Sequence, residues 1–181
     1  MDSTLFLALA LRCAPQVDAG TVQALVAIES GFNPYAIGVV GGALNRQPRT
    51  EAEAIAAAKA LQAEGWNFSV GLAQINVRNL EPLGLTVESA FDPCASLTAM
   101  QTVLADCYDR ALWKDGAAGP VRSQAALRQA LSCYYSGNFI TGFKHGYVHR
   151  VALAARPIHT PSTPEASSTS LSPLVIAKEA P

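Results

Sequence analysis

The stretch VQALVAIESGFNP, residues 22–34, places a single carboxylate at the end of an otherwise apolar run. Apolar side chains follow the i, i+3, i+4 spacing of a buried helix face from Val22, and the i+7 position on that face is Glu29. Gly31 and Pro34 then end the helix. We therefore expect Glu29 at the edge of the hydrophobic core, beside a loop.

A carboxyl group in that position is partly removed from water, and desolvation raises its pKa. A carboxyl group that stays protonated near neutral pH can serve as a general acid. The structural alternative is a Glu29 that binds backbone groups and fixes the next loop, or that turns out to solvent. Periodicity alone favours this alternative, because perturbed carboxylates mark functional sites only statistically.

The composition narrows the classes of protein that this chain can represent. Half of the 181 residues are hydrophobic and 15% are charged, which suits one domain with a sizeable core. The net charge of -1, without a Lys/Arg cluster, argues against a nucleic-acid partner. The apolar stretches are too short to span a bilayer, so no integral membrane segment is expected. LFLALAL, residues 5–11, predicts a first core helix that ends near Cys13, and a weak or removed export signal stays open.

The four cysteines are scattered, with no C-x-x-C pair and no neighbouring histidine, so we expect no zinc site. They suit two disulfides in an oxidising compartment, and the alternative is four buried free thiols in the cytosol. If residues 94–113 form one helix, Cys94 and Cys107 lie roughly 20 Å apart. Because a disulfide needs Cα atoms within about 7 Å, that pairing is excluded. Of the pairings that remain, our hypothesis is that Cys13 pairs with Cys94 and Cys107 pairs with Cys133.

Helix signals predict a mostly α domain over residues 1–156, followed by a Pro/Ser/Thr-rich disordered tail over residues 157–181. Irregular loops are expected around residues 35–48 and 66–74, and the pattern allows a small hairpin beside one of them. One expected helix runs from Asp18 or Thr21 to about Ser30, and a second begins at the capping residues Thr50 and Glu53 and ends at Gly65. A long helix follows Asp92 and Pro93. Two more are expected over about 123–135 and about 139–155.

Two further stretches carry groups that suit a polar ligand. GWNFSVGLAQIN, residues 65–76, combines aromatic, amide and glycine residues in a loop. Its Gly71 lets a backbone approach a ligand closely, and Gln74 and Asn76 offer donors and acceptors for sugar hydroxyls and amides. CYYSGN, residues 133–138, places two tyrosines before a glycine. Alone, the first stretch fits an ordinary helix-entry loop, and the second fits core packing at a helix end.

Taken together and in this order, the motifs resemble those of the SLT-type lytic transglycosylases, whose catalytic domain is lysozyme-like. ESGFNPYAIG corresponds to the family's E-S motif, VGLAQIN to its G-L-M-Q motif and CYYSGN to its Y-N-A-G motif, and GYVHRV matches a fourth element. GWNFSVGLAQIN together with FDPC most resembles the VirB-type subgroup associated with type IV secretion systems. The resemblance covers about residues 10–155. The sequence departs from the family's usual motifs at Ala73, where Met is usual, and at Tyr135, where Asn is usual.

The resemblance implies that Glu29 is the single catalytic residue. It implies that Ser30 orients Glu29 or a substrate N-acetyl group, and that Tyr134 hydrogen-bonds to Glu29 or positions it. No metal or cofactor is expected, and His145 and His149, four residues apart without further ligands, are interpreted as exposed or capping side chains. The residues expected to bind substrate are Ser30, Gly71, Leu72, Gln74, Asn76, Tyr134, Tyr135, Gly137 and Tyr147.

The reaction that the resemblance implies is non-hydrolytic cleavage of the β-1,4 bond between N-acetylmuramic acid and N-acetylglucosamine in peptidoglycan. Protonated Glu29 would donate to the bridging oxygen and would then accept the proton of the C6 hydroxyl, which closes a 1,6-anhydro ring. The implied location is the periplasm, where the enzyme would open the wall for type IV secretion and contact secretion components through its tail. The alternatives are an inactive glycan-binding or assembly module on the same fold, and a goose-type lysozyme that transfers to water.

Overall fold

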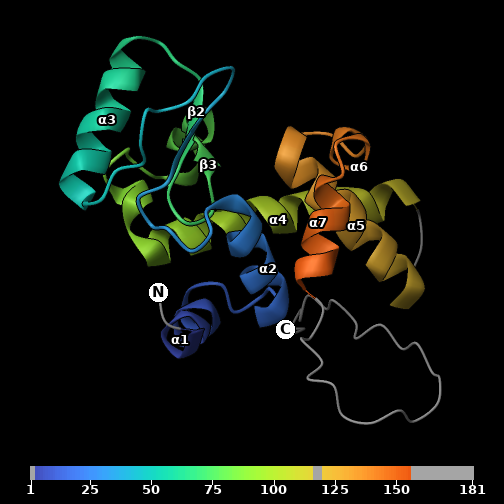
Figure 1. The fold of residues 1–181 in the computed structure, drawn as a ribbon. Coiled ribbons are helices and arrows are strands. Elements are labelled where there is room, and N and C mark those ends of the chain that lie inside the picture. The colour runs from blue at the N-terminus through green and yellow to red at the C-terminus, as the bar shows by residue number, and fades with distance from the viewer. Residues whose placement is uncertain (1–2, 116–119, 156–181) are drawn as a thin grey trace, which may run out of the picture.

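A long helix, α4 (Pro93–Asp115), crosses the centre of the computed structural model, which describes residues 3–115 and 120–155 (Figure 1). It packs along α5 (Pro120–Ser136), and its first part packs against α1 (Ser3–Cys13). Helix α2 (Ala19–Glu29) contacts both α1 and α7 (Tyr147–Ala154). The predicted mostly α fold class is confirmed. The remaining helical segments are α3 (Glu51–Ala63), α6 (Thr141–Lys144) and three short 3₁₀ turns, η1 (Val77–Asn79), η2 (Glu81–Leu83) and η3 (Ser89–Phe91).

Short polar side chains set the starts of α2 and α3, as the sequence predicts. The Asp18 carboxylate accepts the backbone N–H of Thr21, which closes the first turn of α2. The Thr50 hydroxyl accepts from the Glu53 N–H at the start of α3. The Glu53 carboxylate accepts from the Arg49 N–H at 2.9 Å and pairs with Arg46, so it fixes the preceding loop to the helix.

A three-stranded antiparallel sheet lies in and directly after the segments expected to be irregular loops, 35–48 and 66–74. Its strands lie in the order β1 (Ile37–Val39), β2 (Phe68–Val70) and β3 (Ile75–Asn76). Strands β2 and β3 form the small hairpin that the sequence allows, and β1 adds to it from a distant part of the chain. Each strand is only two or three residues long, so alternation gives too few repeats to distinguish a strand from a loop.

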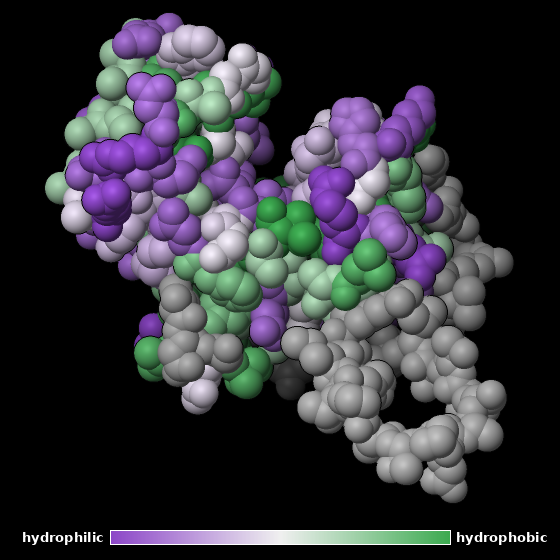
Figure 2. Space-filling view, viewed as in Figure 1, coloured by the Kyte–Doolittle hydropathy of each residue, from purple (hydrophilic) through white to green (hydrophobic). Residues whose placement is uncertain are grey.

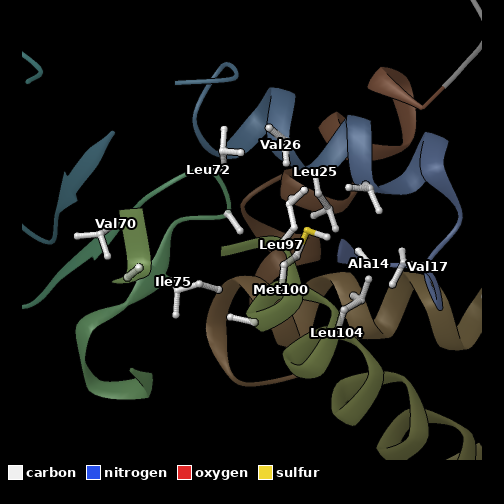
Figure 3. Close-up of a cluster of buried hydrophobic side chains, with 14 of the residues drawn as sticks. Ala14, Val17, Leu25, Val26, Val70, Leu72, Ile75, Leu97, Met100 and Leu104 are labelled. Atoms are coloured by element: carbon white, nitrogen blue, oxygen red, sulfur yellow. The ribbon is translucent and has the colours of Figure 1, made fainter. Parts of the chain in front are cut away.

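The core lies where α2, α4 and the sheet meet (Figure 3). Leu25 and Val26 of α2 point toward Leu97 and Met100 of α4, and all four side chains are fully buried. From the sheet, the buried Val70 extends the core away from this group. The helix face that carries Glu29 is therefore the face that packs into the core, as its apolar spacing predicts.

Two disulfides brace the helical part of the fold, in the pairing that the sequence hypothesis prefers. One joins Cys13 at the end of α1 to Cys94 at the start of α4, with Cα atoms 5.2 Å apart. The other joins Cys107 of α4 to Cys133 of α5, with Cα atoms 5.8 Å apart.

The predicted helix over residues 139–155 is wrong in one respect, because it is two helices. Helix α6 ends at Lys144, and α7 begins at Tyr147 after Gly146, whose φ of 67° lies in the left-handed region. Glycine adopts that conformation at little cost, whereas a helix cannot continue through it. The break turns α7 so that it packs against α2.

The tail predicted over residues 157–181 lies outside the described residues, so it stays a prediction. Within residues 3–115 and 120–155, no helix combines the length and the apolar character that crossing a membrane would require.

Candidate active site

The molecule is divided into two lobes, and its surface is hollowed between them (Figure 2). One lobe holds α3 and the sheet, and the other holds α5, α6 and α7 (Figure 1). A cavity of about 400 Å³ is lined from both lobes. Its lining residues are Glu29, Gly38, Val39, Val40, Ser69, Gln74, Ile75, Asn76, Asn79, Val103, Tyr134, Tyr135 and His145.

Glu29 is the last residue of α2 and lines this cavity. Its helix face explains its environment, since Val22, Leu25 and Val26 are all fully buried. Burial raises the pKa of the Glu29 carboxyl from its ordinary value of 4.5 to about 7, against smaller lowering effects of a hydrogen bond from Tyr147 and the charge of Arg150. A carboxyl group with that pKa exchanges its proton readily near neutral pH.

Tyr147, and not Tyr134, is the tyrosine that holds Glu29. The Tyr147 hydroxyl donates to Glu29 Oε1, and its side chain is only 2% exposed. Tyr134 lines the cavity, but its hydroxyl donates to the backbone oxygen of Ala73 at 2.6 Å. The predicted contact from Tyr134 to Glu29 is therefore corrected, because the packing of α7 on α2 places the other tyrosine against the carboxyl.

Replacing Tyr147 with Phe is expected to raise the pKa of Glu29 further above about 7. A hydrogen bond donated to a carboxylate favours the ionised form, so its loss favours the protonated form. A bond to a charged group contributes roughly 1.5–3 kcal/mol, which corresponds to a pKa change of about one unit or more. The measurement is a carbon-13 NMR titration of the Glu29 side chain. Tyr134→Phe is the matched control, and an equal rise in both variants would contradict the direct contact.

A row of residues across the sheet faces the cavity. Gly38 pairs with Ser69, and Ser69 pairs with Asn76, so the three lie side by side on one face. The neighbouring row, Ile37 with Val70, points into the core. The alternation of buried and partly exposed positions in β2 is the signal that would have identified Ser69, but the strand is too short for it to be read from sequence alone.

Gln74 and Asn76 line the cavity as predicted, and both also fix the loops that shape it. Gln74 has a φ of 49°, and its side-chain amide donates to the backbone oxygens of Ala36 and Gly71. Asn76 donates to the Asn67 side chain at 2.9 Å and accepts from a backbone N–H. A positive φ in a non-glycine residue costs free energy that the surrounding contacts must offset, and it is typical of functional loops.

Five of the residues expected to bind substrate do not line the cavity, and one of them is Tyr147, which instead contacts Glu29. Leu72 is 0% exposed and belongs to the core. A Cβ on Gly71 would lie 2.4 Å from the backbone oxygen of Ala90, so this glycine permits close packing inside the fold. The Ser30 hydroxyl donates to the Val26 backbone oxygen, and Gly137 ends α5 with a φ of 74°. Their motif positions have structural roles in this chain.

Sequence reasoning missed the contribution of His145 to the cavity. As expected, His145 caps a helix end, but its ring also lines the cavity beside Tyr135. Its Nδ1 lies 3.2 Å from the Tyr135 hydroxyl. Tyr135 in turn stacks on Tyr147, with ring centroids 4.5 Å apart. The tyrosine that departs from the family pattern therefore links the cavity wall to the residue that holds Glu29.

Arg150 is the other residue that sequence reasoning missed. It lies on α7 and donates to the backbone oxygen of His145 at 3.0 Å. Its charge favours the ionised form of Glu29, although less strongly than burial disfavours it. The sequence shows a positive charge one turn after Tyr147, but this charge indicates an effect on Glu29 only when the packing of α7 on α2 is known.

The chemistry available in the cavity is that of one proton-exchanging carboxyl group. Among the described residues that line it, Glu29 is the only carboxylate. Glycosidases with two carboxylates place them about 5–10 Å apart across the scissile bond, and the lining offers no such pair. In the described parts of the chain, no three His, Cys, Asp or Glu side chains gather in a way that could hold a metal ion.

The chain is similar to one described protein family and to several known proteins. The profile of the family described as "Transglycosylase SLT domain" matches residues 6–151. Type IV secretion system protein virB1 of Brucella abortus is 52% identical over 155 residues, which are 83% of this chain and 63% of that protein. Protein virB1 of Rhizobium radiobacter is 38% identical over 160 residues, which are 87% of this chain and 64% of that protein. No solved structure matches.

The chain thus spans less than two thirds of the length of these relatives. The family match nevertheless covers all four motifs, from the helix that carries Glu29 to the one that carries Tyr147. The resemblance to the VirB-type subgroup is confirmed by the relatives, and the mostly helical structure agrees with the predicted lysozyme-like class. The chain belongs to the family of transglycosylase SLT domains.

Proposed function

We propose that this chain is a peptidoglycan lytic transglycosylase in which Glu29 alone acts as general acid and then as general base. The observation that carries the proposal is the position of Glu29 in the cavity between the lobes, with a pKa of about 7 and no second carboxylate among the described lining residues. A group with a pKa near the working pH can give and take a proton in successive steps.

In the first step, protonated Glu29 donates its proton to the oxygen that bridges N-acetylmuramic acid and N-acetylglucosamine. The bond from the anomeric carbon to that oxygen breaks, and the neighbouring N-acetyl group assists by attacking the anomeric carbon, as in substrate-assisted glycosidases. Tyr147 supports this step, because its hydrogen bond orients the carboxyl group and favours the carboxylate that remains.

In the second step, ionised Glu29 accepts the proton of the C6 hydroxyl of the muramic acid. The C6 oxygen forms a bond to the anomeric carbon and displaces the N-acetyl group, which gives a 1,6-anhydro ring and restores protonated Glu29. Water takes no part, so the products weigh one water less than those of hydrolysis.

The names of the relatives support a role in a type IV secretion system, in which the enzyme would open the cell wall locally. The two disulfides suit the periplasm, which is an oxidising compartment. We further propose that residues 157–181 contact secretion components. Co-purification of such components with the full chain, but not with a chain that ends at residue 156, is the expected result.

The test of the reaction is digestion of purified peptidoglycan followed by mass analysis of the released muropeptides. Anhydro ends are expected. Reducing ends would instead indicate a goose-type lysozyme that transfers to water. A wild-type protein that binds peptidoglycan and releases no product would favour the glycan-binding or assembly module.

A further inference from the structure

Trp66 is a half-exposed aromatic side chain that the proposed reaction does not use. It follows α3, and 45% of its surface is exposed. Its indole N–H donates to Glu64 Oε2 at 2.9 Å, and its backbone N–H donates to the Leu61 oxygen at 2.9 Å. Two hydrogen bonds therefore hold a large apolar ring at the surface in a fixed orientation.

The ring lies next to the edge of the cavity. A Cβ placed on Gly42 would lie 3.5 Å from Val39 Cγ1 and 3.7 Å from Trp66 Cζ3, so both side chains border the same glycine. Val39 and Val40 line the cavity that contains Glu29, and Val40 is itself largely exposed. We call Val39, Val40, Gly42 and Trp66 the Trp66 shelf, which continues the cavity wall beyond its edge.

Backbone and side-chain contacts connect the Trp66 shelf to the polar floor of the cavity. Asn67, directly after Trp66, accepts the Val40 N–H on its backbone oxygen at 2.9 Å. Its side chain accepts from Asn76 at 2.9 Å. Asn67 thus connects the Trp66 shelf to the row that contains Asn76, and Val40, two residues after Gly38, is the shelf residue that adjoins that row.

The chemistry of this surface favours a carbohydrate. The described cavity residues on the sheet side offer hydroxyl and amide groups, from Ser69, Asn76 and Asn79, and carry no charge. A pyranose ring has an apolar face of C–H groups and a rim of hydroxyls, so it can pack on an indole and bind amides at once. A protein partner would find few charged groups here to pair with.

We propose that the Trp66 shelf is an outer saccharide subsite, which binds a sugar ring of the glycan strand several units from the bond at Glu29. This inference rests on the proposed function for the identity of the strand. Binding energy from a remote sugar helps only strands long enough to reach it. Trp66→Ala should lower kcat/KM about tenfold on long glycan strands, the effect of losing one aromatic contact, and leave short strands unaffected.

The activity test compares Trp66→Ala, Trp66→Phe and Trp113→Ala with the wild type on purified glycan strands of two lengths. Trp113 is 87% exposed and does not line the cavity, so its variant is the matched control. Trp66→Phe keeps an aromatic face and should recover much of the loss. Equal rates for all four proteins on long strands would overturn the subsite and leave the proposed function intact.

A binding test separates the subsite from catalysis. The chain has two tryptophans, so Trp113→Phe in a Glu29→Gln background leaves Trp66 as the only indole. Its fluorescence should change saturably with long glycan strands and stay constant with the disaccharide. If the strands sediment with the protein while the emission stays constant, the subsite is refuted. A response of Trp66 in a protein whose wild type releases no product would retain the subsite and refute the enzyme.

Discussion

Glu29→Gln is expected to lower the rate of anhydro-muropeptide release by about a thousandfold, within the range of roughly 10²–10⁴ that general acid–base catalysis contributes. The side chain keeps its size but can neither give nor take the proton that both steps need. Because no other carboxylate is found among the described residues that line the cavity, nothing there can replace it. The measurement is the initial rate of anhydro-product formation from purified peptidoglycan, by mass spectrometry.

A matched control distinguishes this loss from a general effect of removing a charge. Glu53→Gln removes an exposed carboxylate on α3 that pairs with Arg46, and it lies outside the cavity lining. Its rate should equal that of the wild type. Substantial product formation by Glu29→Gln, with the same anhydro ends, would contradict the assignment of Glu29.

The stability of Glu29→Gln provides a check that the variant folds. A carboxyl whose pKa is about 7 when folded and 4.5 when unfolded binds its proton more tightly in the folded state. The contribution of Glu29 to wild-type stability is therefore fully present below pH 4.5, falls as the pH rises toward 7, and is lost above it, a change of about 3 kcal/mol. Gln does not titrate, so thermal melts should coincide near pH 4 and favour the variant at pH 8. A less stable variant at pH 8 would contradict the desolvation of Glu29.

Removal of the Cys13–Cys94 disulfide, through Cys13→Ser with Cys94→Ser, is expected to lower the free energy of unfolding more than removal of Cys107–Cys133. The bond spans 81 residues of sequence, whereas Cys107–Cys133 spans 26. A longer loop gains more conformational freedom in the unfolded chain when it is released. The loop-closure estimate is about 4.5 kcal/mol for the first pair and about 3.5 kcal/mol for the second.

The contacts around the two disulfides also predict a larger loss of stability when Cys13–Cys94 is removed. Helices α4 and α5 pack along each other and would stay together without Cys107–Cys133. Helix α1 contacts α4 less extensively. The Thr98 hydroxyl donates to the Cys13 oxygen, and the N–H of Gln16, just after α1, donates to Gln101. Urea unfolding of both double variants under non-reducing conditions measures the difference. A greater loss from Cys107→Ser with Cys133→Ser would contradict the loop-length argument.

Much of the helical framework could be predicted because its signals are local. Asp18 and Thr50 cap α2 and α3 where the sequence places them, since a cap depends only on the next three residues. The sheet could not be predicted in the same way. Pairing of Gly38 with Ser69 joins segments about thirty residues apart in the chain, and the strands are too short to carry a period.

The candidate site also has features that the local sequence predicts and others that depend on the tertiary structure. The sequence by itself determined that Glu29 continues the apolar face of α2, because helical periodicity fixes which side chains share a face. Which tyrosine holds the carboxyl was decided by the tertiary structure: Tyr147 lies 118 positions away and reaches Glu29 only because Gly146 breaks the helix and α7 packs on α2. Tyr134 has the same hydroxyl, but α5 directs it to Ala73. A side chain's partner across the fold depends on how helices pack, which no local pattern specifies.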